Sequence, residues 1–318
     1  TTLSAIPVHV SICCSLSPWA IREIDKRRRV FVWAGTDTVS GGRCRVAWTV
    51  ACSPRDLGGL GLPDLRTLGF ALRLRWEWQR RSDIDAPWAL LPSRAEKAVA
   101  AMFSASVSVQ VGDGTRTLFW TDSWLPDGPI ERSAPTLFAR VGHRRRRRTV
   151  KDALTAHRWV RDIAGARTQP VMLAILDLAD KLAGVHLTPG LDDRFIWKWT
   201  ASGDYSSASA YRAFFAGTTE LLGARELWKT RPPPPKVKFF FWLGLHGRLW
   251  TSERRARHGL QQSPTCVLCD QLDETHDHLL AACVYTREVW LRILSTFALG
   301  HLTPTADDTL LDWWLRTR

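Results

Sequence analysis

The chain has 318 residues, and its 44 Lys and Arg against 31 Asp and Glu give a formal net charge of +13. With 45% hydrophobic residues it can bury a core, which excludes a disordered or collagen-like protein. No apolar run reaches the roughly 18 residues that a membrane-spanning helix needs, so we expect no membrane-spanning role. The length favours two domains, or one domain with smaller satellite segments.

Hydrophobic periodicity and turn residues predict a mainly helical chain with small β hairpins, an α+β fold. In the first half we expect a helix over Trp19–Trp33, capped by Ser17 and Pro18, and a second helix over Leu65–Arg81. A hairpin is predicted for Val107–Val111 and Thr117–Thr121, which flank a Gly-Asp-Gly turn. The run Arg144–Arg148 is typical of a solvated loop, because like charges repel.

The second half continues this pattern. The predicted elements are a strand over Arg194–Trp199 and helices over Ser206–Phe215, Lys236–Leu249, Ser252–His258 and Leu279–Phe297. The last helix is expected to bury Leu280, Val284, Trp290, Ile293, Leu294 and Phe297.

The seven cysteines indicate a reducing compartment. Their number is odd, no secretory signal peptide precedes them, and the chain has no Asn that could carry an N-linked glycan. We therefore expect no disulfides and an intracellular location, nuclear or cytoplasmic. Because the chain starts at Thr1 without a methionine, we also expect it to be a piece of a longer product.

Three of the cysteines lie close together at the spacing of metal ligands. Cys266, Cys269, His278 and Cys283 supply three thiols and one imidazole, the ligand set of a closed, tetrahedral, structural zinc site. The two-residue gap between the first two lets one tight turn direct both sulfurs at one ion. His276 is the alternative imidazole ligand, and buried free cysteines beside unrelated histidines are the alternative without a metal.

Several motifs in this order resemble plant LINE-type (non-long-terminal-repeat) retroelement reverse transcriptases. CVLCDQLDETHDHLLAAC, preceded by PPPPKVKFFFWLGLHGRLWT, resembles the zinc-binding domain that follows the polymerase, and IWKWTASGDYSSASAY resembles its start. Upstream, VGDGTRTLFWTDSWL and REIDKRRRVFVWAGTD resemble family segments that follow the palm. The resemblance implies a helical thumb region over residues 1–100, a hairpin and Arg-rich connecting region over 101–192, and a zinc-binding domain over 193–318.

The palm carboxylates that hold two metal ions in such polymerases are not found in this chain. The pairs Asp192-Asp193 and Asp307-Asp308 are interpreted as solvated caps or turns, and no endonuclease or ribonuclease H carboxylate set is visible. We therefore expect no enzyme activity from the chain, which would bind RNA or DNA as a zinc-stabilised part of a reverse transcriptase. The alternatives are a structural zinc module for protein interaction, with other retroelement proteins as possible partners, and a fragment of an active RNA-directed DNA polymerase.

Charge separates the zinc loop from the helices around it. Residues 259–290 carry one Arg and five acids, whereas residues 229–258 carry eight basic side chains and one acid. We expect the basic helices to contact phosphates and the zinc loop to brace them. The candidates are Lys236, Lys238, Arg248, Arg254, Arg255 and Arg257, with Arg22, Lys26, Arg27, Arg28 and Arg29 in the first half. Trp242 and Trp250 could stack on an unpaired base; the alternative is that both belong to the core.

Overall fold

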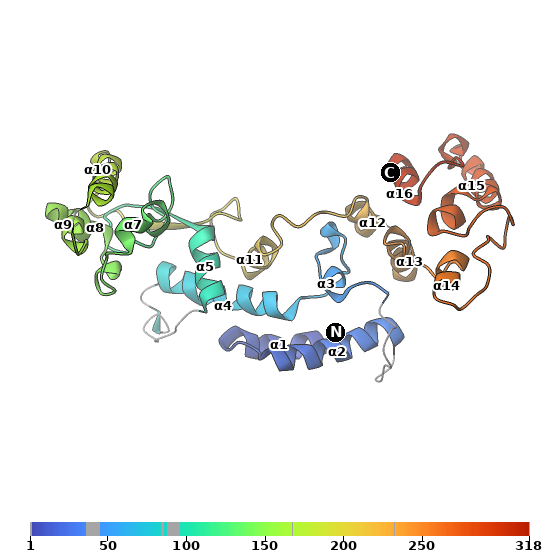
Figure 1. The fold of residues 1–318 in the computed structure, drawn as a ribbon, viewed down its shortest axis with the longest axis horizontal. Helices are drawn as coiled ribbons and strands as arrows, with labels where there is room; N and C mark the ends of the chain where they lie inside the picture. Colours follow the sequence, from blue (N-terminus) through green and yellow to red (C-terminus); the bar gives the residue numbers. More distant parts are fainter. Residues whose placement is uncertain are drawn as a thin grey trace. The chain divides into compact units, whose positions relative to one another are not determined.

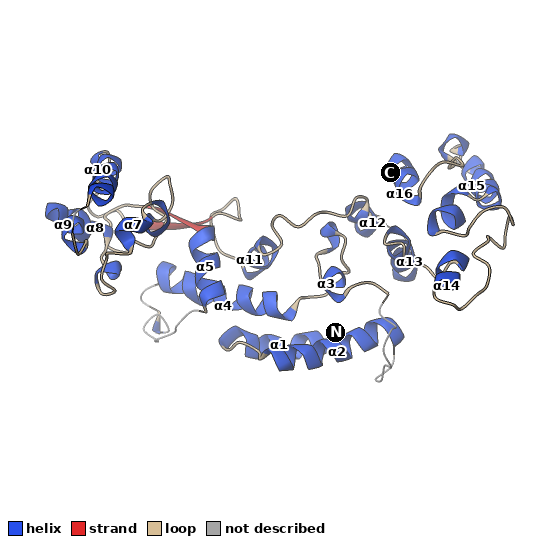
Figure 2. Cartoon of the chain, viewed as in Figure 1, coloured by secondary structure: helices blue, strands red, loops and turns tan. Residues whose placement is uncertain are grey.

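The computed structural model describes residues 2–35, 45–83, 86–87, 96–166, 168–231 and 233–317. In these ranges the chain is mainly α-helical with one two-stranded sheet (Figure 2), which confirms the predicted fold class. It divides into two compact units. Unit 1 consists of Thr1–Ser4, Ser17–Leu65 and Phe215–Arg318, and unit 2 of Ala5–Leu16 and Arg66–Phe214. The division into three domains stays a prediction.

Unit 1 combines an early and a late segment of the chain (Figure 1). Its helical elements are α2 (Pro18–Ala34), α3 (Trp48–Ala51), η1 (Arg55–Leu57), α12 (Ala224–Lys229), α13 (Pro235–Leu245), α14 (Ser252–Arg257), η5 (His278–Ala282), α15 (Val284–Thr296), η6 (Gly300–Leu302) and α16 (Leu310–Thr317). The predicted N-terminus of α2 is confirmed, because the Ser17 hydroxyl accepts the Ala20 N–H at 3.1 Å and Pro18 is the first helical residue.

The core of unit 1 joins its two segments. Trp242 and Leu243 of α13 pack in a buried cluster with Val46, and the Trp242 indole N–H donates to the carbonyl of Gly58 at 2.7 Å. The chain bends closely here: a Cβ on Gly59 would lie 1.9 Å from the Ser53 carbonyl oxygen. Glycine at position 59 thus lets the turn fold tightly on the preceding residues, and the turn presents the Gly58 carbonyl to α13.

Unit 2 contains the sheet and the remaining helices. Its elements are α1 (Thr2–Cys13), α4 (Leu65–Ser82), α5 (Lys97–Ser106), β1 (Val107–Gln110), α6 (Ile130–Ser133), α7 (Pro135–Phe138), η3 (Arg145–Arg147), α8 (Val150–Leu154), η4 (Thr155–His157), α9 (Arg158–Asp162), α10 (Gln169–Ala183), β2 (Arg194–Trp197) and α11 (Ser207–Ala213). The predicted helix over Leu65–Arg81 and the predicted strand after Asp193 are both present, as α4 and β2.

The predicted local hairpin is wrong. β1 pairs antiparallel with β2, with Val107 opposite Trp197 and Gln110 opposite Arg194. The Gly-Asp-Gly segment does not turn back into a partner strand. Its backbone N–H groups surround the carboxylate of a residue about 80 positions later in the chain. A local hairpin and this pairing share the same alternation of side chains along β1, so the pattern does not distinguish them.

That carboxylate belongs to Asp193, which is 4% exposed, so its interpretation as a solvated cap is wrong. One oxygen accepts the backbone N–H groups of Gly112 and Gly114, at 2.8 and 2.9 Å. The other accepts the backbone N–H groups of Arg116 and Thr117 and the Thr117 hydroxyl, at 2.8 to 3.0 Å. Burial raises the pKa of Asp193, but these hydrogen bonds outweigh it and hold the pKa below its ordinary value.

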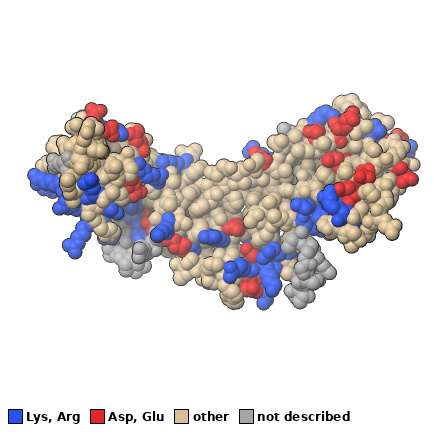
Figure 3. Space-filling view, viewed as in Figure 1, with Lys and Arg blue, Asp and Glu red and all other residues tan. Residues whose placement is uncertain are grey.

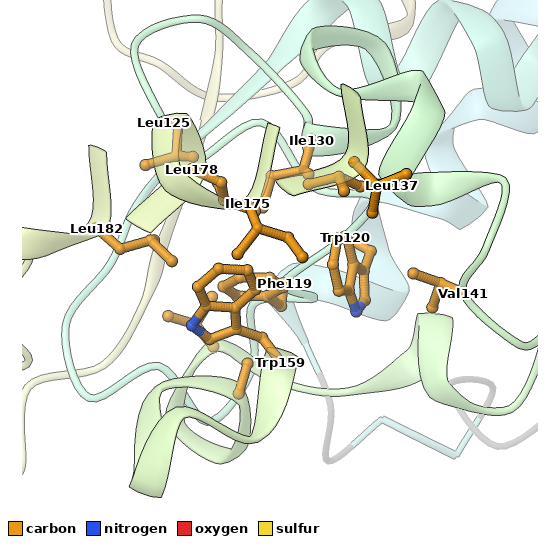
Figure 4. Close-up of a cluster of buried hydrophobic side chains, with 13 residues drawn as sticks. Phe119, Trp120, Leu125, Ile130, Leu137, Val141, Trp159, Ile175, Leu178 and Leu182 are labelled. Carbon is orange, nitrogen blue, oxygen red and sulfur yellow. The ribbon is translucent and has the colours of Figure 1, made fainter. Parts of the chain in front are cut away.

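Figure 4 shows the larger core of unit 2, where Phe119, Trp120 and Trp159 meet Ile175 of α10. The arginine run borders this core and is only in part a solvated loop. Arg148 donates to both oxygens of buried Asp162, at 2.7 and 2.8 Å, and Arg146 lies 4.2 Å over the ring of Phe138. Like charges are tolerated here because some of the guanidinium groups have partners inside the fold.

Candidate functional site

A tight turn carries the first two predicted zinc ligands, Cys266 and Cys269. The N–H of Cys266 donates to the Leu272 carbonyl at 2.8 Å, and the N–H of Asp270 donates back to the Cys266 carbonyl at 2.9 Å. Asp270 has φ +54°, a left-handed conformation that closes the turn. The segment that carries the two cysteines is thereby folded back on itself, which brings their sulfur atoms within 4.8 Å of each other.

The other two ligands come from either end of the π-helical turn η5. His278 begins the turn, with its backbone N–H donating to the Thr275 hydroxyl at 3.0 Å. Cys283 follows the turn in an extended conformation, with φ −59° and ψ 134°, and its N–H donates to the His278 carbonyl at 2.7 Å. The predicted single helix over Leu279–Phe297 is therefore interrupted at Cys283, and α15 starts after it.

The structure brings all four predicted ligands together. The three sulfurs and one imidazole nitrogen lie within 4.8 Å of one another, and Cys269 Sγ is 3.2 Å from His278 Nε2. Cys266, Cys283 and His278 are buried, and Cys269 is partly exposed. Zinc bonds of about 2.3 Å to sulfur and about 2.0 Å to nitrogen separate tetrahedral ligands by about 3.5–3.8 Å. The cluster fits a zinc ion in both donor chemistry and size.

Local electrostatics favour a thiolate at the outer cysteine. Backbone N–H groups of Gln271 and Leu272 hydrogen-bond to Cys269 and hold its pKa below the ordinary value for a thiol. Burial raises the pKa of Cys266. A cation bound between the two would favour the thiolate at both positions.

His276, the alternative ligand, lies outside this cluster. Its Nε2 is 3.4 Å from a carboxylate oxygen of Asp277, and its ring approaches the backbone at Gly247. His276 and His278 are only two positions apart, yet their side chains contact different neighbours.

The zinc loop is tied to the surrounding helices, as the charge pattern predicted. Buried Glu274 accepts the backbone N–H of Ser252, the first residue of α14, at 2.8 Å. Asp277 accepts the N–H of Leu310, the first residue of α16, at 2.8 Å. Trp290 of α15 packs against Trp313 of α16 with ring centroids 4.6 Å apart and the ring planes tilted by 52°. The acidic side chains of this segment thus act as fixed acceptors at the starts of helices.

The expected burial on α15 is largely wrong. Val284, Ile293 and Phe297 are exposed, whereas Leu280, Trp290 and Leu294 are half-buried. Periodicity shows which side chains share a helix face, but burial depends on what packs against that face, and here α16 meets α15 through Trp313 and Trp290.

Among the basic candidates on α2, the prediction that Arg28 contacts a phosphate is wrong. Its side chain is 3% exposed, donates to Asp25 and to the Pro63 carbonyl, both at 2.7 Å, and lies over the Trp48 ring. Arg28 therefore stabilises unit 1, and its buried side chain cannot reach a phosphate. The exposed candidates on this helix are Arg22, Lys26 and Arg27; Arg29 is half-buried.

The candidates around α13 and α14 are mostly accessible. Lys236, Arg248, Arg255 and Arg257 are exposed, while Lys238 donates to the carbonyls of α12's last turn. Figure 3 shows basic side chains gathered near α14, with acidic side chains beside them.

The two tryptophans have different environments. Trp242 is fully buried, so the prediction that it could stack on a base is wrong. Trp250 is 45% exposed, with the Arg254 guanidinium 4.6 Å from its ring centre. Of these two tryptophans, Trp250 is the one that can present an aromatic face to a partner.

The remaining acidic pair, Asp307-Asp308, lies just before α16, whose first turn is capped by the Thr309 hydroxyl. Asp308 accepts two N–H groups of Arg316, at 2.8 and 2.6 Å, and the N–H of Thr305 at 2.6 Å. The Arg316 guanidinium lowers the pKa of Asp308 to about 2. Asp307 is exposed. Asp307 thus lies in a solvated turn, as the sequence interpretation allowed, whereas Asp308 is held by Arg316 and does not cap a helix.

Comparison with known proteins points to the same segment. Residues 205–290 match the family described as zinc-binding in reverse transcriptase, and all four clustered ligands lie inside this match. The segment therefore resembles the zinc-binding part of a reverse transcriptase. Together, this match and the Cys3His cluster fit a bound zinc ion.

The chain is also similar to an Arabidopsis thaliana protein named "Putative ribonuclease H protein", with 25% identity over 92% of this chain. It spans about half the length of that relative, 50% of its residues. No solved structure matches the chain. No helix in the described ranges is both long and apolar enough to cross a membrane.

Proposed function

We propose that this chain is a non-catalytic, zinc-stabilised, nucleic-acid-binding part of a LINE-type retroelement reverse transcriptase. The observation that carries the proposal is the Cys3His cluster, which lies inside the segment similar to reverse-transcriptase zinc domains. Glu274, between the second and third clustered residues in sequence, ties this segment to the basic helix α14. The relative's ribonuclease H name supports a retroelement origin, since reverse transcription leaves an RNA–DNA hybrid. The order of motifs along the chain supports the LINE type.

In this proposal zinc is structural. Four protein ligands leave no open coordination position for substrate or water, so the ion would cross-link the turn at Cys266 to η5. Glu274 and Asp277 then hold the starts of α14 and α16 against that cross-linked segment. The zinc loop thus fixes where the arginines of α14 lie, and those arginines meet the phosphates.

We predict that RNA and DNA binding depends on salt through α14. Wild-type affinity for a single strand should fall with a log–log slope of about −0.7 per phosphate contacted. Replacing Arg254, Arg255 and Arg257 by Gln should shrink that slope by about two units, because three charges are lost. Fluorescence anisotropy titrations from 50 to 300 mM salt, about the range in which such slopes are resolved, measure this.

Asp273→Ala is the matched control, because Asp273 is an exposed acid of the zinc loop. It should leave the affinity unchanged or raise it slightly. A slope that the triple replacement does not alter would place the contact surface elsewhere. Failure of the wild type to bind RNA or DNA at low salt would favour the alternative of a zinc module for protein interaction.

We further predict that the purified chain incorporates no nucleotides on a primed template. Positioning a nucleotide with two metal ions needs carboxylates at the end of a palm strand, and the candidate pairs serve other roles here. Asp193 is saturated by five hydrogen bonds and Asp308 is bonded to Arg316. Magnesium-dependent primer extension that Asp307→Ala abolishes would contradict this assignment.

A further inference from the structure

A pocket of about 300 Å³ lies beside the zinc cluster, between the segment 247–258 and the residues 275–277 that lead into η5. Arg248, Arg254 and Arg257 line it. All of its walls belong to unit 1, and the bonds from Glu274 to α14 hold them together. The cavity is therefore a feature of the zinc module itself.

The two carboxylates in the pocket wall already have partners. The Glu253 carboxylate forms an ion pair with Arg257, one turn further along α14. Asp277 accepts the N–H of Leu310 and lies 3.4 Å from His276. In the described ranges no ion pair engages Arg248 or Arg254, and three guanidinium groups line the pocket against two carboxylates, so its wall keeps a net positive charge.

Arg254 is the pocket residue whose positive charge is least well accommodated by the fold. Its Nη1 atom is buried without a hydrogen-bond partner in the described part of the chain. Burial and the nearby guanidinium groups of Arg248, Arg45 and Arg257 all lower the pKa of Arg254. A buried, unpaired donor on a cation is costly, and an anion that accepts from it would remove that cost.

Trp250 adds a second kind of contact at the same place. Its ring is 45% exposed and lies beside Arg254, with His258 edge-on at 5.4 Å between ring centroids. A single strand offers a phosphate and an unstacked base next to each other, whereas a duplex hides its base faces. This juxtaposition matches the chemistry of a single strand.

We propose that the pocket binds one phosphate of single-stranded nucleic acid through Arg254, and that Trp250 stacks on the adjacent base. This inference rests on the nucleic-acid binding proposed above and assigns it to one site. Arg248 shares the charge of that phosphate. Arg255, which does not line the pocket, and the exposed Arg257 meet neighbouring phosphates of the strand at the surface of α14, where each contact is weaker.

The test compares two neighbouring arginines in the full zinc-loaded chain. Arg254→Gln should raise the Kd for a single-stranded oligonucleotide about tenfold, and Arg255→Gln should raise it about twofold or less, although both remove one charge. RNA and DNA strands of the same sequence are titrated in parallel to identify the source of the phosphate. Unchanged zinc content and circular dichroism establish that each variant is folded.

A second experiment tests the stacking contact and leaves the charge of the pocket unchanged. For the wild type, replacing the bases of the oligonucleotide by abasic sites should weaken binding about tenfold, and Trp250→Ala should remove that difference. Duplex binding should not respond to Trp250→Ala. Equal weakening by the two arginine variants, or abasic strands that bind as well as normal ones, would overturn the pocket but leave general binding intact. A wild type that binds no nucleic acid would overturn both proposals.

Discussion

Removing zinc with a chelator should unfold the segment from about 260 to 297 while unit 2 keeps its structure. Binding energies of small structural zinc sites are on the order of 10 kcal/mol, which is large beside the few hydrogen bonds and the ring contact that tie this segment to α14 and α16. No residue of α15 is buried, and Val267 and Leu268 of the ligand turn are exposed. Hydrogen exchange should show loss of protection at the amides of Cys266, Asp270 and Cys283, with α10 unchanged.

Variants separate the four ligands from other candidates. Cys269→Ser and His278→Ala should lower the bound zinc well below one per chain, as measured by metal analysis. Cys14→Ser, an exposed cysteine of unit 2, and His276→Ala should retain zinc. Metal analysis that returns no zinc for the wild type, or wild-type zinc content in Cys269→Ser, would contradict the assignment.

Replacing Asp193 by Ala should destabilise unit 2 by about 3–5 kcal/mol, because several buried donors lose their acceptor at once. The donors are the backbone N–H groups of Gly112, Gly114, Arg116 and Thr117 and one hydroxyl. Urea unfolding followed through hydrogen exchange of those amides measures the effect. Asp192→Ala, a neighbouring exposed acid, is the control and should change stability little.

The same carboxylate makes unit 2 sensitive to acid. The pKa of Asp193 is depressed in the folded state, so its contribution is fully present above the unfolded value of about 3.9 and is lost as pH falls through the lower, folded value. Wild-type unit 2 should therefore lose stability below about pH 4, and Asp193→Asn should flatten that part of the profile. An identical profile in the variant would show that other acids dominate.

The sequence by itself determined the elements whose signals are local. Ser17 and Pro18 mark the start of α2, and Ser206 caps α11 through the Ser209 N–H at 3.1 Å. The two-residue spacing of Cys266 and Cys269 predicted one turn that directs two sulfurs inward, which the structure contains. Caps, helical periodicity and ligand spacing depend on residues a few positions apart, so they can be read without knowing the fold.

The tertiary structure decided which of several residues with similar local sequence signals becomes buried and which stays exposed. Arg27 and Arg28 are adjacent in sequence, yet only Arg28 meets Asp25 and the Pro63 carbonyl and becomes buried. Trp242 bonds to a carbonyl 184 residues away, and Asp193 accepts from Gly112, 81 residues away. Because a buried polar group must find its partner wherever the fold places one, these roles depend on distant contacts that local patterns do not encode.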